Sequence, residues 1–251
     1  MPPAHWYTGL VVGIKELAPK VKSFELEIPE VVSFDFIAGQ FITLDLPVGD
    51  KRLQRWRSYS ISSAPAGTNK IELCIVHFDG GLGSTYFFDQ VVVGTELKFK
   101  GPEGGFVLPE VIDQDVVMIC TGTGIAPFRS MIWDIYHTGK THRDIHLIFG
   151  TRRKEDILYA LEWEWLMNNI PGFKFEVALS RESVSSGPEA GLLTKLHAGH
   201  VHPIYQAAYD TPRPDIHFYL CGWSKMIDEA VENLFGEIGF GREQIHFELY
   251  G

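Results

Sequence analysis

The chain has 251 residues, so one large domain or two medium-sized domains are both compatible with its length. With 45% hydrophobic and 22% charged residues it has an ordinary globular composition, and its formal net charge of −10 argues against nucleic acid or an anionic membrane surface as the main partner. The three cysteines, Cys74, Cys120 and Cys221, show no spacing that resembles a zinc or iron–sulfur ligand set, so any iron–sulfur partner is expected on another chain.

No apolar run approaches the roughly 18 residues that a membrane-spanning helix requires. The first residues, MPPAHWYTG, also lack the basic and then apolar pattern of a signal peptide. These features predict a cytoplasmic protein with reduced thiols and no membrane span.

The first part of the chain, from Trp6 to about Glu110, has many short apolar runs and little helical periodicity, which is typical of a β-barrel or β-sandwich. Apolar and polar residues alternate in 22–28, 42–46 and 71–75, as in strands with one buried face. Turn signals separate them, as in Ala64-Pro65-Ala66-Gly67. We therefore predict an antiparallel β domain.

Two segments of this β domain are candidate cofactor-binding segments. Arg57, Tyr59 and Ser60 place a phosphate-pairing guanidinium, an aromatic ring and a hydroxyl close together on one strand. A solvent-facing strand with a core tyrosine is the simpler interpretation of that segment alone. The second segment begins with Ile75 and His77 and continues into a glycine turn with hydroxyls, a further candidate phosphate site that includes Gly83, Ser84 and Thr85.

A strand, a glycine turn and a helix start follow one another between Val116 and Arg129. Residues 116–120 form the continuous apolar run of a strand buried on both faces. Gly122 and Gly124 flank Thr123 and lack the Cβ that would keep phosphates away from the backbone, and Pro127 suits the first turn of a helix. The turn predicts an anion site at a helix N-terminus, although a tight turn without a ligand fits the same residues.

After about Val111 the pattern changes to alternating strands and helices. Strands are predicted at 145–149, 173–179 and 216–220, and helices at 155–168 and 225–235. This alternation predicts a parallel sheet with helices on both faces and a ligand at the carboxyl ends of its strands. We place the domain boundary between residues 111 and 112, which gives an all-β domain over 1–111 and an α/β domain over 112–251.

Two other features admit a simple interpretation. His197, His200 and His202 suggest a metal site, but they lie on a predicted loop with no nearby carboxylate, so solvated histidines and no metal are expected. The basic run from Lys51 to Arg57 is either a docking face for an acidic electron carrier or an exposed loop.

The order of these motifs resembles the ferredoxin–NADP reductase superfamily. The matching features, in chain order, are Arg57-Ser58-Tyr59-Ser60, the glycine-serine turn, a GPxGxF motif, the GTGIAP turn and a late Cys-Gly pair. The GPxGxF motif consists of Gly101, Pro102, Gly104 and Phe106, and the late pair is Cys221-Gly222. The resemblance covers nearly the whole chain. It implies a two-domain β plus α/β fold, with an antiparallel FAD-binding β-barrel followed by a parallel-sheet NADP-binding domain.

The resemblance also implies roles for particular residues. Arg57 and the Gly83-Ser84-Thr85 turn would hold the FAD diphosphate, Tyr59 would stack on the flavin, and Ser60 would lie near flavin N5. Cys221 would lie beside the nicotinamide, although a small core thiol is the simpler interpretation. At the chain end, Glu248 and Tyr250 match a glutamate and an aromatic residue that covers the flavin, and Gly251 is an additional residue.

The choice between NADP and NAD depends on the residues that meet the adenosine ribose. The predicted strand ends carry basic or hydroxyl side chains, and arginine there favours a 2′-phosphate, as in the family's NADP enzymes. We expect Arg152, Arg153, Ser180 and Arg181 to bind NADP, while a solvated loop and NAD remain alternatives.

The predicted function is therefore an FAD-dependent oxidoreductase that exchanges hydride with NADP(H) and single electrons with a separate ferredoxin or flavodoxin. One alternative is the NADH-dependent reductase component of an oxygenase. Another is a non-catalytic flavin-binding subunit of a larger complex. The acceptor, the direction of electron flow and the oligomeric state are left open.

Overall fold

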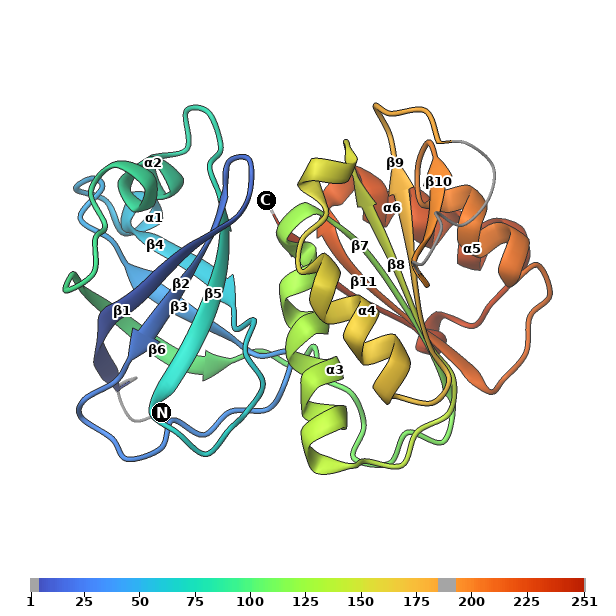
Figure 1. Ribbon diagram of the computed structural model, residues 1–251, viewed down its shortest axis with the longest axis horizontal. Helices are drawn as coiled ribbons and strands as arrows, with labels where there is room; N and C mark the ends of the chain where they lie inside the picture. The colour runs from blue at the N-terminus through green and yellow to red at the C-terminus, as the bar shows by residue number, and fades with distance from the viewer. Residues whose placement is uncertain (1–4, 185–192, 251) are drawn as a thin grey trace. The chain divides into compact units, whose positions relative to one another are not determined.

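The computed structural model describes residues 5–184 and 193–250. The described residues form two compact units, one within Met1–Leu108 and Ala126–Asp134, the other within Pro109–Ile125 and Ile135–Gly251. Gly251, the extra residue at the chain end, lies outside the described residues. Each unit is built around its own six-stranded sheet (Figure 1).

The sheet of the first unit is antiparallel throughout and has the order β4-β3-β6-β1-β2-β5. An additional antiparallel bridge joins Ile61, directly after β4, to Leu73 on β5. This bridge links the two edge strands, so that the sheet closes into a barrel. Its strands are β1 (Trp6–Ala18), β2 (Val21–Glu27), β3 (Phe41–Asp45), β4 (Trp56–Ser60), β5 (Lys70–Val76) and β6 (Glu96–Glu103).

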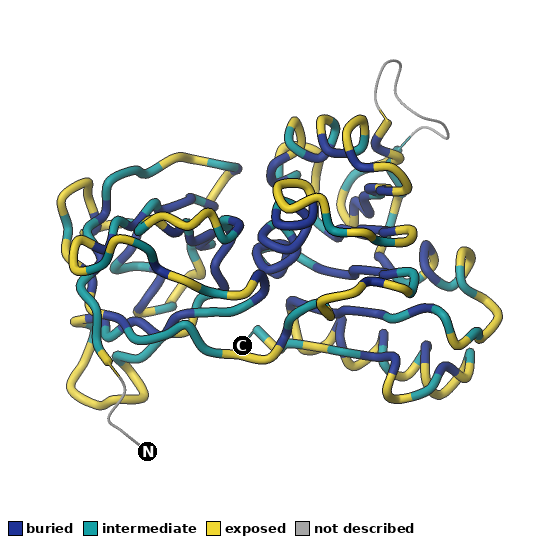
Figure 2. The backbone as a smooth tube through the Cα atoms, turned by 90° about the horizontal axis from the view of Figure 1, so that it is seen from below, coloured by how far each residue is buried: buried dark blue, intermediate teal, exposed yellow. Residues whose placement is uncertain are grey.

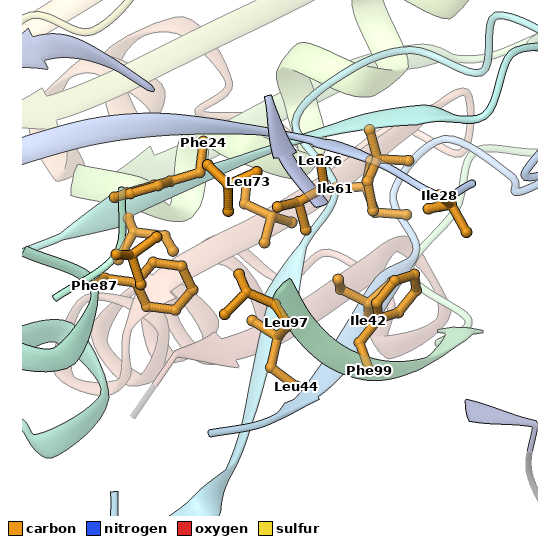
Figure 3. Packing of buried hydrophobic residues seen from close by; sticks show 14 of the residues in the cluster. Phe24, Leu26, Ile28, Ile42, Leu44, Ile61, Leu73, Phe87, Leu97 and Phe99 are labelled. Carbon is orange, nitrogen blue, oxygen red and sulfur yellow. The ribbon is translucent and has the colours of Figure 1, made fainter. Parts of the chain in front are cut away.

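The interior of the barrel is filled by the apolar residues that alternate along its strands. Phe24, Leu26 and Leu44 are fully buried, as the sequence pattern predicts, and Phe87 of helix α2 (Leu82–Asp89) packs against them (Figure 3). A short helix, α1 (Arg52–Arg55), precedes β4. The barrel therefore holds β4 and α2, which carry candidate flavin-binding residues, on one hydrophobic core.

The sheet of the second unit is parallel throughout, with the order β10-β9-β8-β7-β11-β12. The predicted strands are confirmed, and β7 is buried along residues 116–120. The strands are β7 (Asp115–Thr121), β8 (Ile145–Thr151), β9 (Phe173–Leu179), β10 (Lys195–Ala198), β11 (Ile216–Trp223) and β12 (Ile245–Tyr250). The order reverses at β7, so the ends of β7 and β11 are where such sheets bind ligands.

Helices cover both faces of this sheet. One face packs on α5 (His202–Ala208) and α6 (Ser224–Val231), whereas Trp163 of α4 (Ala160–Asn169) packs on the rings of Phe173 and Phe175 on the other face. Figure 2 shows buried residues along the strands and along one helix, and exposed residues in loops and outer helix turns. The remaining helical segments are η1 (Gly122–Ile125), α3 (Ala126–Thr138), η2 (Lys154–Asp156), η3 (Glu232–Ile238) and η4 (Arg242–Gln244).

Two predicted helices differ from the structure at their ends. The helix expected from residue 155 begins only at Ala160, because Tyr159 has a left-handed φ of 58° that a continuous helix does not allow. The helix expected over 225–235 ends at Val231 and continues as the π-helical segment η3. Propensity alone does not predict either change.

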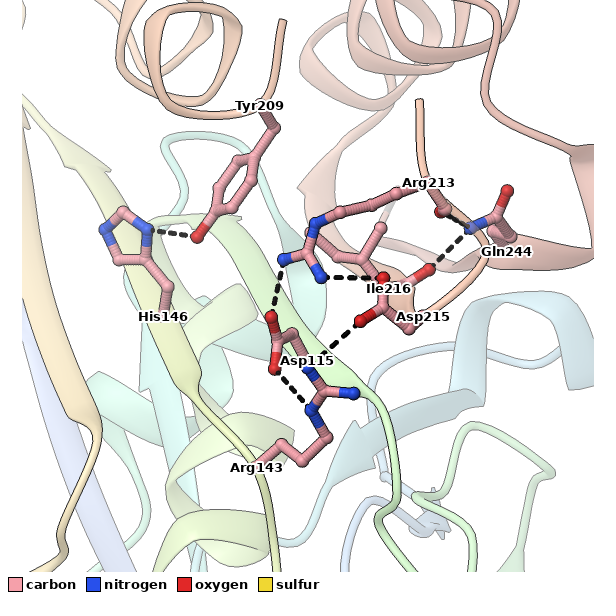
Figure 4. A network of polar contacts seen from close by, with 8 residues as sticks. All are labelled: Asp115, Arg143, His146, Tyr209, Arg213, Asp215, Ile216 and Gln244. Atoms are coloured by element: carbon pink, nitrogen blue, oxygen red, sulfur yellow. Dashed lines mark hydrogen bonds and ion pairs between the residues drawn. The ribbon is translucent and has the colours of Figure 1, made fainter. Parts of the chain in front are cut away.

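A polar network fixes the opposite, N-terminal ends of the central strands (Figure 4). Arg213 donates to Asp115 at 2.5 Å and to Asp215 at 2.8 Å. Arg143 pairs with the same two carboxylates at 3.1 and 3.0 Å. The two arginines therefore tie the start of β7 to the segment before β11.

Candidate cofactor-binding site

The glycine turn after β7 and the Cys-Gly end of β11 interlock. A Cβ on Gly124 would lie 2.3 Å from the carbonyl oxygen of Cys221, and a Cβ on Gly222 would lie 2.5 Å from Oγ1 of Thr121. Gly222 also has a φ of +139°, which other residues rarely adopt. Only glycine at both positions allows this contact, so the carboxyl ends of β7 and β11 are held together.

The same turn has the features of an anion site. Gly122 has a φ of +54° and no side chain, and η1 leads directly into α3, which has a proline in its first turn. The N–H groups and the positive dipole end of a helix attract a phosphate, and glycine allows it close to the backbone. The turn of Gly122, Thr123 and Gly124 therefore fits the diphosphate of a dinucleotide.

Cys221 is a neutral, buried thiol. It is inaccessible to solvent, and its pKa is raised well above the usual value, chiefly by burial and also by Glu248, while a hydrogen bond with Tyr250 works in the opposite direction. Because a thiol that stays protonated is a poor nucleophile, the residue is suited to packing and positioning. The β11–β12 register places Cys221 beside Glu248 and Trp223 beside Tyr250.

In the first unit, the glycine turn of α2 packs against the candidate arginine and tyrosine of β4. A Cβ on Gly83 would lie 3.1 Å from Cγ of Arg57 and 3.4 Å from the hydroxyl of Tyr59. Nη1 of Arg57 donates to the carbonyls of Leu53 and Trp56 at 2.8 and 2.7 Å. Within residues 5–184 and 193–250, no partner is seen for Nε and Nη2 of Arg57, and these donors fit a phosphate beside the α2 N-terminus.

Ser60 is buried, whereas Tyr59 and Arg57 are both half-buried. The ring of Tyr59 meets Phe87 edge-on at 5.6 Å, and burial raises the pKa of Tyr59 to about 12, so that its hydroxyl remains a donor at neutral pH. Ser60 is 4% exposed. The segment thus combines a ring and two hydroxyls in a largely apolar environment, as a planar polar cofactor requires.

The remaining candidates on the barrel take different positions. The hydroxyl of Ser84 hydrogen-bonds the backbone of Phe78 and Gly81, so this side chain fixes its own turn, whereas Thr85 is half-buried on the first turn of α2. Ile75 is 1% exposed and belongs to the barrel core. His77 lies 3.5 Å from Asp79 and packs its ring on Phe88.

The four candidates for the adenosine phosphate meet at the carboxyl ends of β8 and β9. The backbone N–H of Arg181 donates to the carbonyl of Arg152 at 2.9 Å, and the hydroxyl of Ser180 donates to the Thr151 carbonyl at 3.2 Å. Both Arg152 and Arg181 are exposed, and in the described part of the chain neither has a carboxylate partner. Arg153, by contrast, lies 3.6 Å from Glu155.

Two contributions to this site were not predicted from the sequence. Thr121 accepts a hydrogen bond from the backbone N–H of Trp223 at 3.3 Å. The Nε1 atom of Trp223 lies 4.0 Å from the place that a Cβ on Gly122 would occupy. The sequence does indicate both residues, because Thr121 directly precedes Gly122 and Trp223 directly follows Gly222.

The prediction that the three histidines lie on a loop without carboxylates was wrong for His197 and His202, whereas His200 is exposed on the segment between β10 and α5. His197 lies on β10 and contacts Glu176, and His202 begins α5 with its Nε2 atom 3.0 Å from Glu229. Among the described residues, no group of three or more His, Cys, Asp or Glu side chains is arranged to hold a metal ion. His197 and His202 are therefore engaged in contacts with nearby glutamates.

The basic run before β4 is largely occupied by internal contacts. Arg55 is paired with Asp45, and the guanidinium of Arg52 lies over the ring of Trp56 at 3.8 Å. Leu53 between them is 89% exposed. The run therefore offers less free positive charge than its sequence suggests.

Comparison with known proteins identifies the family. Residues 9–108 match the family model described as an oxidoreductase FAD-binding domain, and residues 118–232 match an oxidoreductase NAD-binding domain. Over 244 residues the chain is 30% identical to ferredoxin–NADP reductase B of Sorangium cellulosum, with 97% of each chain covered. The chain belongs to the ferredoxin–NADP reductase superfamily.

A solved structure has the same fold, and the sequence relatives include proteins with names other than ferredoxin–NADP reductase. A solved ferredoxin–NADP⁺ reductase from Neisseria gonorrhoeae with bound FAD and NADP is 25% identical, with a TM-score of 0.77 and 98% and 99% of the two chains covered. The phenol hydroxylase P5 protein of Acinetobacter pittii is 29% identical over 97% of this chain and 65% of its own length.

These findings confirm the predicted β plus α/β fold and an FAD- and NAD(P)H-dependent reductase. The interlocked turns at Gly124 and Gly222 fit the nicotinamide dinucleotide, and the Gly83–Arg57 contact fits FAD. None of the helices within residues 5–184 and 193–250 is long and apolar enough to cross a membrane.

Proposed function

We propose that this reductase passes electrons between NADPH and a separate one-electron carrier, ferredoxin or flavodoxin. The match to a ferredoxin–NADP reductase over 97% of both chains supports this assignment. We also propose residues 1–111 as the FAD-binding domain, residues 112–251 as the NAD(P)-binding domain, and a cytoplasmic location. When bound, FAD supplies the chemistry that side chains lack, since it exchanges hydride with nicotinamide and single electrons with the carrier.

In this proposal the barrel binds the flavin. Arg57 pairs with the FAD diphosphate through Nε and Nη2, and the α2 N-terminus at Gly83 adds a backbone N–H group. Thr85 contributes its hydroxyl, because its own N–H donates to the carbonyl of Gly81 at 2.9 Å. Ser84 shapes that turn through its own backbone contacts. Tyr59 supplies a ring for the flavin and Ser60 a hydroxyl donor at its reacting edge. His77 follows the adjoining end of β5, and Ile75 on that strand packs in the barrel core.

The carboxyl ends of β11 and β12 orient the nicotinamide. Cys221 packs there as a neutral thiol and forms a hydrogen bond with Tyr250. Gly222, which has no side chain, leaves space beside Cys221. Glu248 lies in register with Cys221 and supplies a carboxylate that can hold a proton at this end of the sheet. The turn of Gly122, Thr123 and Gly124 binds the diphosphate.

One observation carries the choice of NADPH over NADH. Arg152 and Arg181 stand on adjacent strand ends joined by a backbone hydrogen bond, and both guanidinium groups are exposed without a carboxylate partner in the described chain. Two uncompensated arginines at a ribose site favour a phosphate over a hydroxyl. Ser180 and Arg153 flank the same site.

A second candidate function is the reductase component of an oxygenase system. It is favoured by the similarity to the phenol hydroxylase P5 protein and to the DmpP reductase component of a phenol 2-monooxygenase. This chain spans 65% and 62% of those proteins, so the likeness covers part of each. A preference for NADH and electron delivery to an oxygenase component would select this function.

The deciding experiment compares NADPH and NADH oxidation by wild type and Arg181→Ala. Loss of one charge-assisted hydrogen-bond pair weakens binding by about 1.5–3 kcal/mol, or roughly one to two decades. The KM for NADPH should rise accordingly and that for NADH should not change. Arg242→Ala, at an exposed arginine of η4, is the control. Equal effects of Arg181→Ala on both nucleotides would exclude 2′-phosphate recognition.

A separate test addresses the flavin. Heating the purified protein should release FAD, and ferredoxin or flavodoxin should be reduced faster than an oxygenase component. Recovery of FMN alone, or a colourless protein that FAD does not reconstitute, would contradict the assignment.

A further inference from the structure

The last residue of β11 is a large aromatic side chain at the glycine turn. Trp223 is 54% exposed, and its Nε1 atom lies 4.0 Å from the Cβ position of Gly122. Its backbone N–H donates to Oγ1 of Thr121 at 3.3 Å. The indole is therefore held beside the bare backbone of Gly122.

The local backbone explains why the indole stays at this position. Gly222 lies against Thr121 and has a positive φ, so the backbone that carries Trp223 is held in place at the end of β11. A tryptophan normally buries most of its large surface, because the ring is apolar apart from one N–H group. Half of this ring remains exposed beside the turn that fits a diphosphate, which is a favourable place for a ligand to cover it.

We propose that Trp223 is a nucleotide-binding residue that contacts the ribose-diphosphate part of the dinucleotide. The inference rests on the proposed function and adds a residue to the same site. An indole N–H is a donor only, and phosphate oxygens are acceptors only, so the two groups are complementary. The indole face supplies an apolar surface for the ribose.

This role differs from that of Arg181 in its dependence on the nucleotide. The ribose-diphosphate part is common to NADP⁺ and NAD⁺, whereas the 2′-phosphate is present only in NADP⁺. Loss of the Trp223 ring should weaken both nucleotides by a similar factor. Loss of Arg181 should weaken NADP⁺ alone.

A structural alternative is that Trp223 acts through its neighbour in the sheet. Trp223 and Tyr250 are register partners on β11 and β12. In this alternative, removal of the indole changes nucleotide affinity only because it displaces the tyrosine. A double-mutant cycle separates the two roles, because an effect that passes through Tyr250 disappears when Tyr250 is already absent.

The experiment is calorimetric titration of the FAD-loaded protein with NADP⁺ and with NAD⁺. Trp223→Ala should weaken both by about tenfold, through the combined loss of stacking and a charge-assisted hydrogen bond. Trp223→Phe should recover part of the loss, because it keeps a ring but no N–H. Trp165→Ala, at a 42% exposed tryptophan of α4, should change neither affinity. The thermal midpoint of each variant checks that it folds.

Three outcomes would overturn the inference. Unchanged affinities of Trp223→Ala, a loss confined to NADP⁺, or a loss that vanishes in the Tyr250→Ser background would each remove Trp223 from direct binding. If Arg181→Ala still weakens NADP⁺ selectively in those cases, the proposed function stands. If the wild type binds neither nucleotide, the proposed function itself fails.

Discussion

Gly124 lies in the turn η1 after β7 and Cys221 lies on β11, and the Cα of Gly124 faces the carbonyl of Cys221 so closely that no side chain fits between them. The contact joins the turn that fits a diphosphate to the residue that we propose to lie beside the nicotinamide. A substitution at either position should therefore displace the backbone at the other.

Gly124→Ala is expected to damage both stability and nucleotide binding. The new Cβ would lie 2.3 Å from the Cys221 carbonyl oxygen, so β7 and β11 must separate at their ends. Overpacking of this kind costs about 1–3 kcal/mol, which urea denaturation measures, and NADP⁺ affinity should fall with it. Gly105→Ala is the control, because nothing lies within 4 Å of its new Cβ. Similar losses in the two variants would show that the close contact is not the cause.

The strands were predictable because the burial of a strand on one or both faces determines the pattern of apolar residues along it. The apolar run 116–120 and the alternation in 22–28 reflect strands buried on two faces and on one face, and both appear as expected. The motifs that fit the cofactors were predictable for a related reason, since glycine turns and strand ends are local features.

What could not be predicted are the contacts between distant segments. Nothing in the sequence shows that Gly83 packs on Arg57, or that Glu176 of β9 meets His197 of β10. The left-handed turn at Tyr159 is also set by tertiary packing, because isolated residues of this type avoid it. Register and side-chain pairing arise only when the whole sheet forms.

His146 should make the second unit less stable in mild acid. Burial lowers its pKa from 6.5 to about 4, although Glu176 acts in the opposite direction. Between these values the unfolded chain binds a proton and the folded chain does not, so stability falls as pH falls from about 6.5 towards 4. At pH 5 the loss relative to pH 7 amounts to about 2 kcal/mol.

The test is urea denaturation of wild type and His146→Gln at pH 7 and pH 5. Glutamine is uncharged and can still hydrogen-bond the Tyr209 hydroxyl, which lies 2.8 Å from Nδ1 of His146. The variant should lose less stability on acidification than wild type. The same pH dependence in both proteins would show that other groups cause it.

Arg213 should contribute more to stability than an exposed ion pair does. It donates to Asp115 and Asp215, and the Asp115 side chain is only 15% exposed. Arg213→Ala is expected to cost about 1.5–3 kcal/mol, because hydrogen bonds to partly buried charges are lost. Lys225→Ala removes an i,i+4 pair with Glu229 in which the lysine side chain is 89% exposed, and it should cost less than about 1 kcal/mol.

Urea denaturation in low and high salt distinguishes these two variants. The effect of Lys225→Ala should vanish in high salt, since exposed pairs are screened, and that of Arg213→Ala should largely persist. Equal costs for the two variants would mean that the network in Figure 4 does not stabilise the strand ends.

Tyr250 is expected to cover the flavin in the resting enzyme and to move aside for the nicotinamide. It ends β12, in register with Trp223 and hydrogen-bonded to Cys221, so it is anchored on one side and lies at the end of its strand. An aromatic stack contributes about 0.5–1.5 kcal/mol beyond burial, enough for the ring to compete with nicotinamide without preventing turnover. Tyr250→Ser should therefore strengthen NADP⁺ binding and narrow the preference for NADPH over NADH, because the nicotinamide end is common to both. Phe247→Ser, on the same strand with a half-exposed side chain of opposite alternation, should change neither property. Titration of NADP⁺ followed by flavin difference absorbance decides the matter, since unchanged affinity and unchanged preference in Tyr250→Ser would mean that the tyrosine does not compete for the ring.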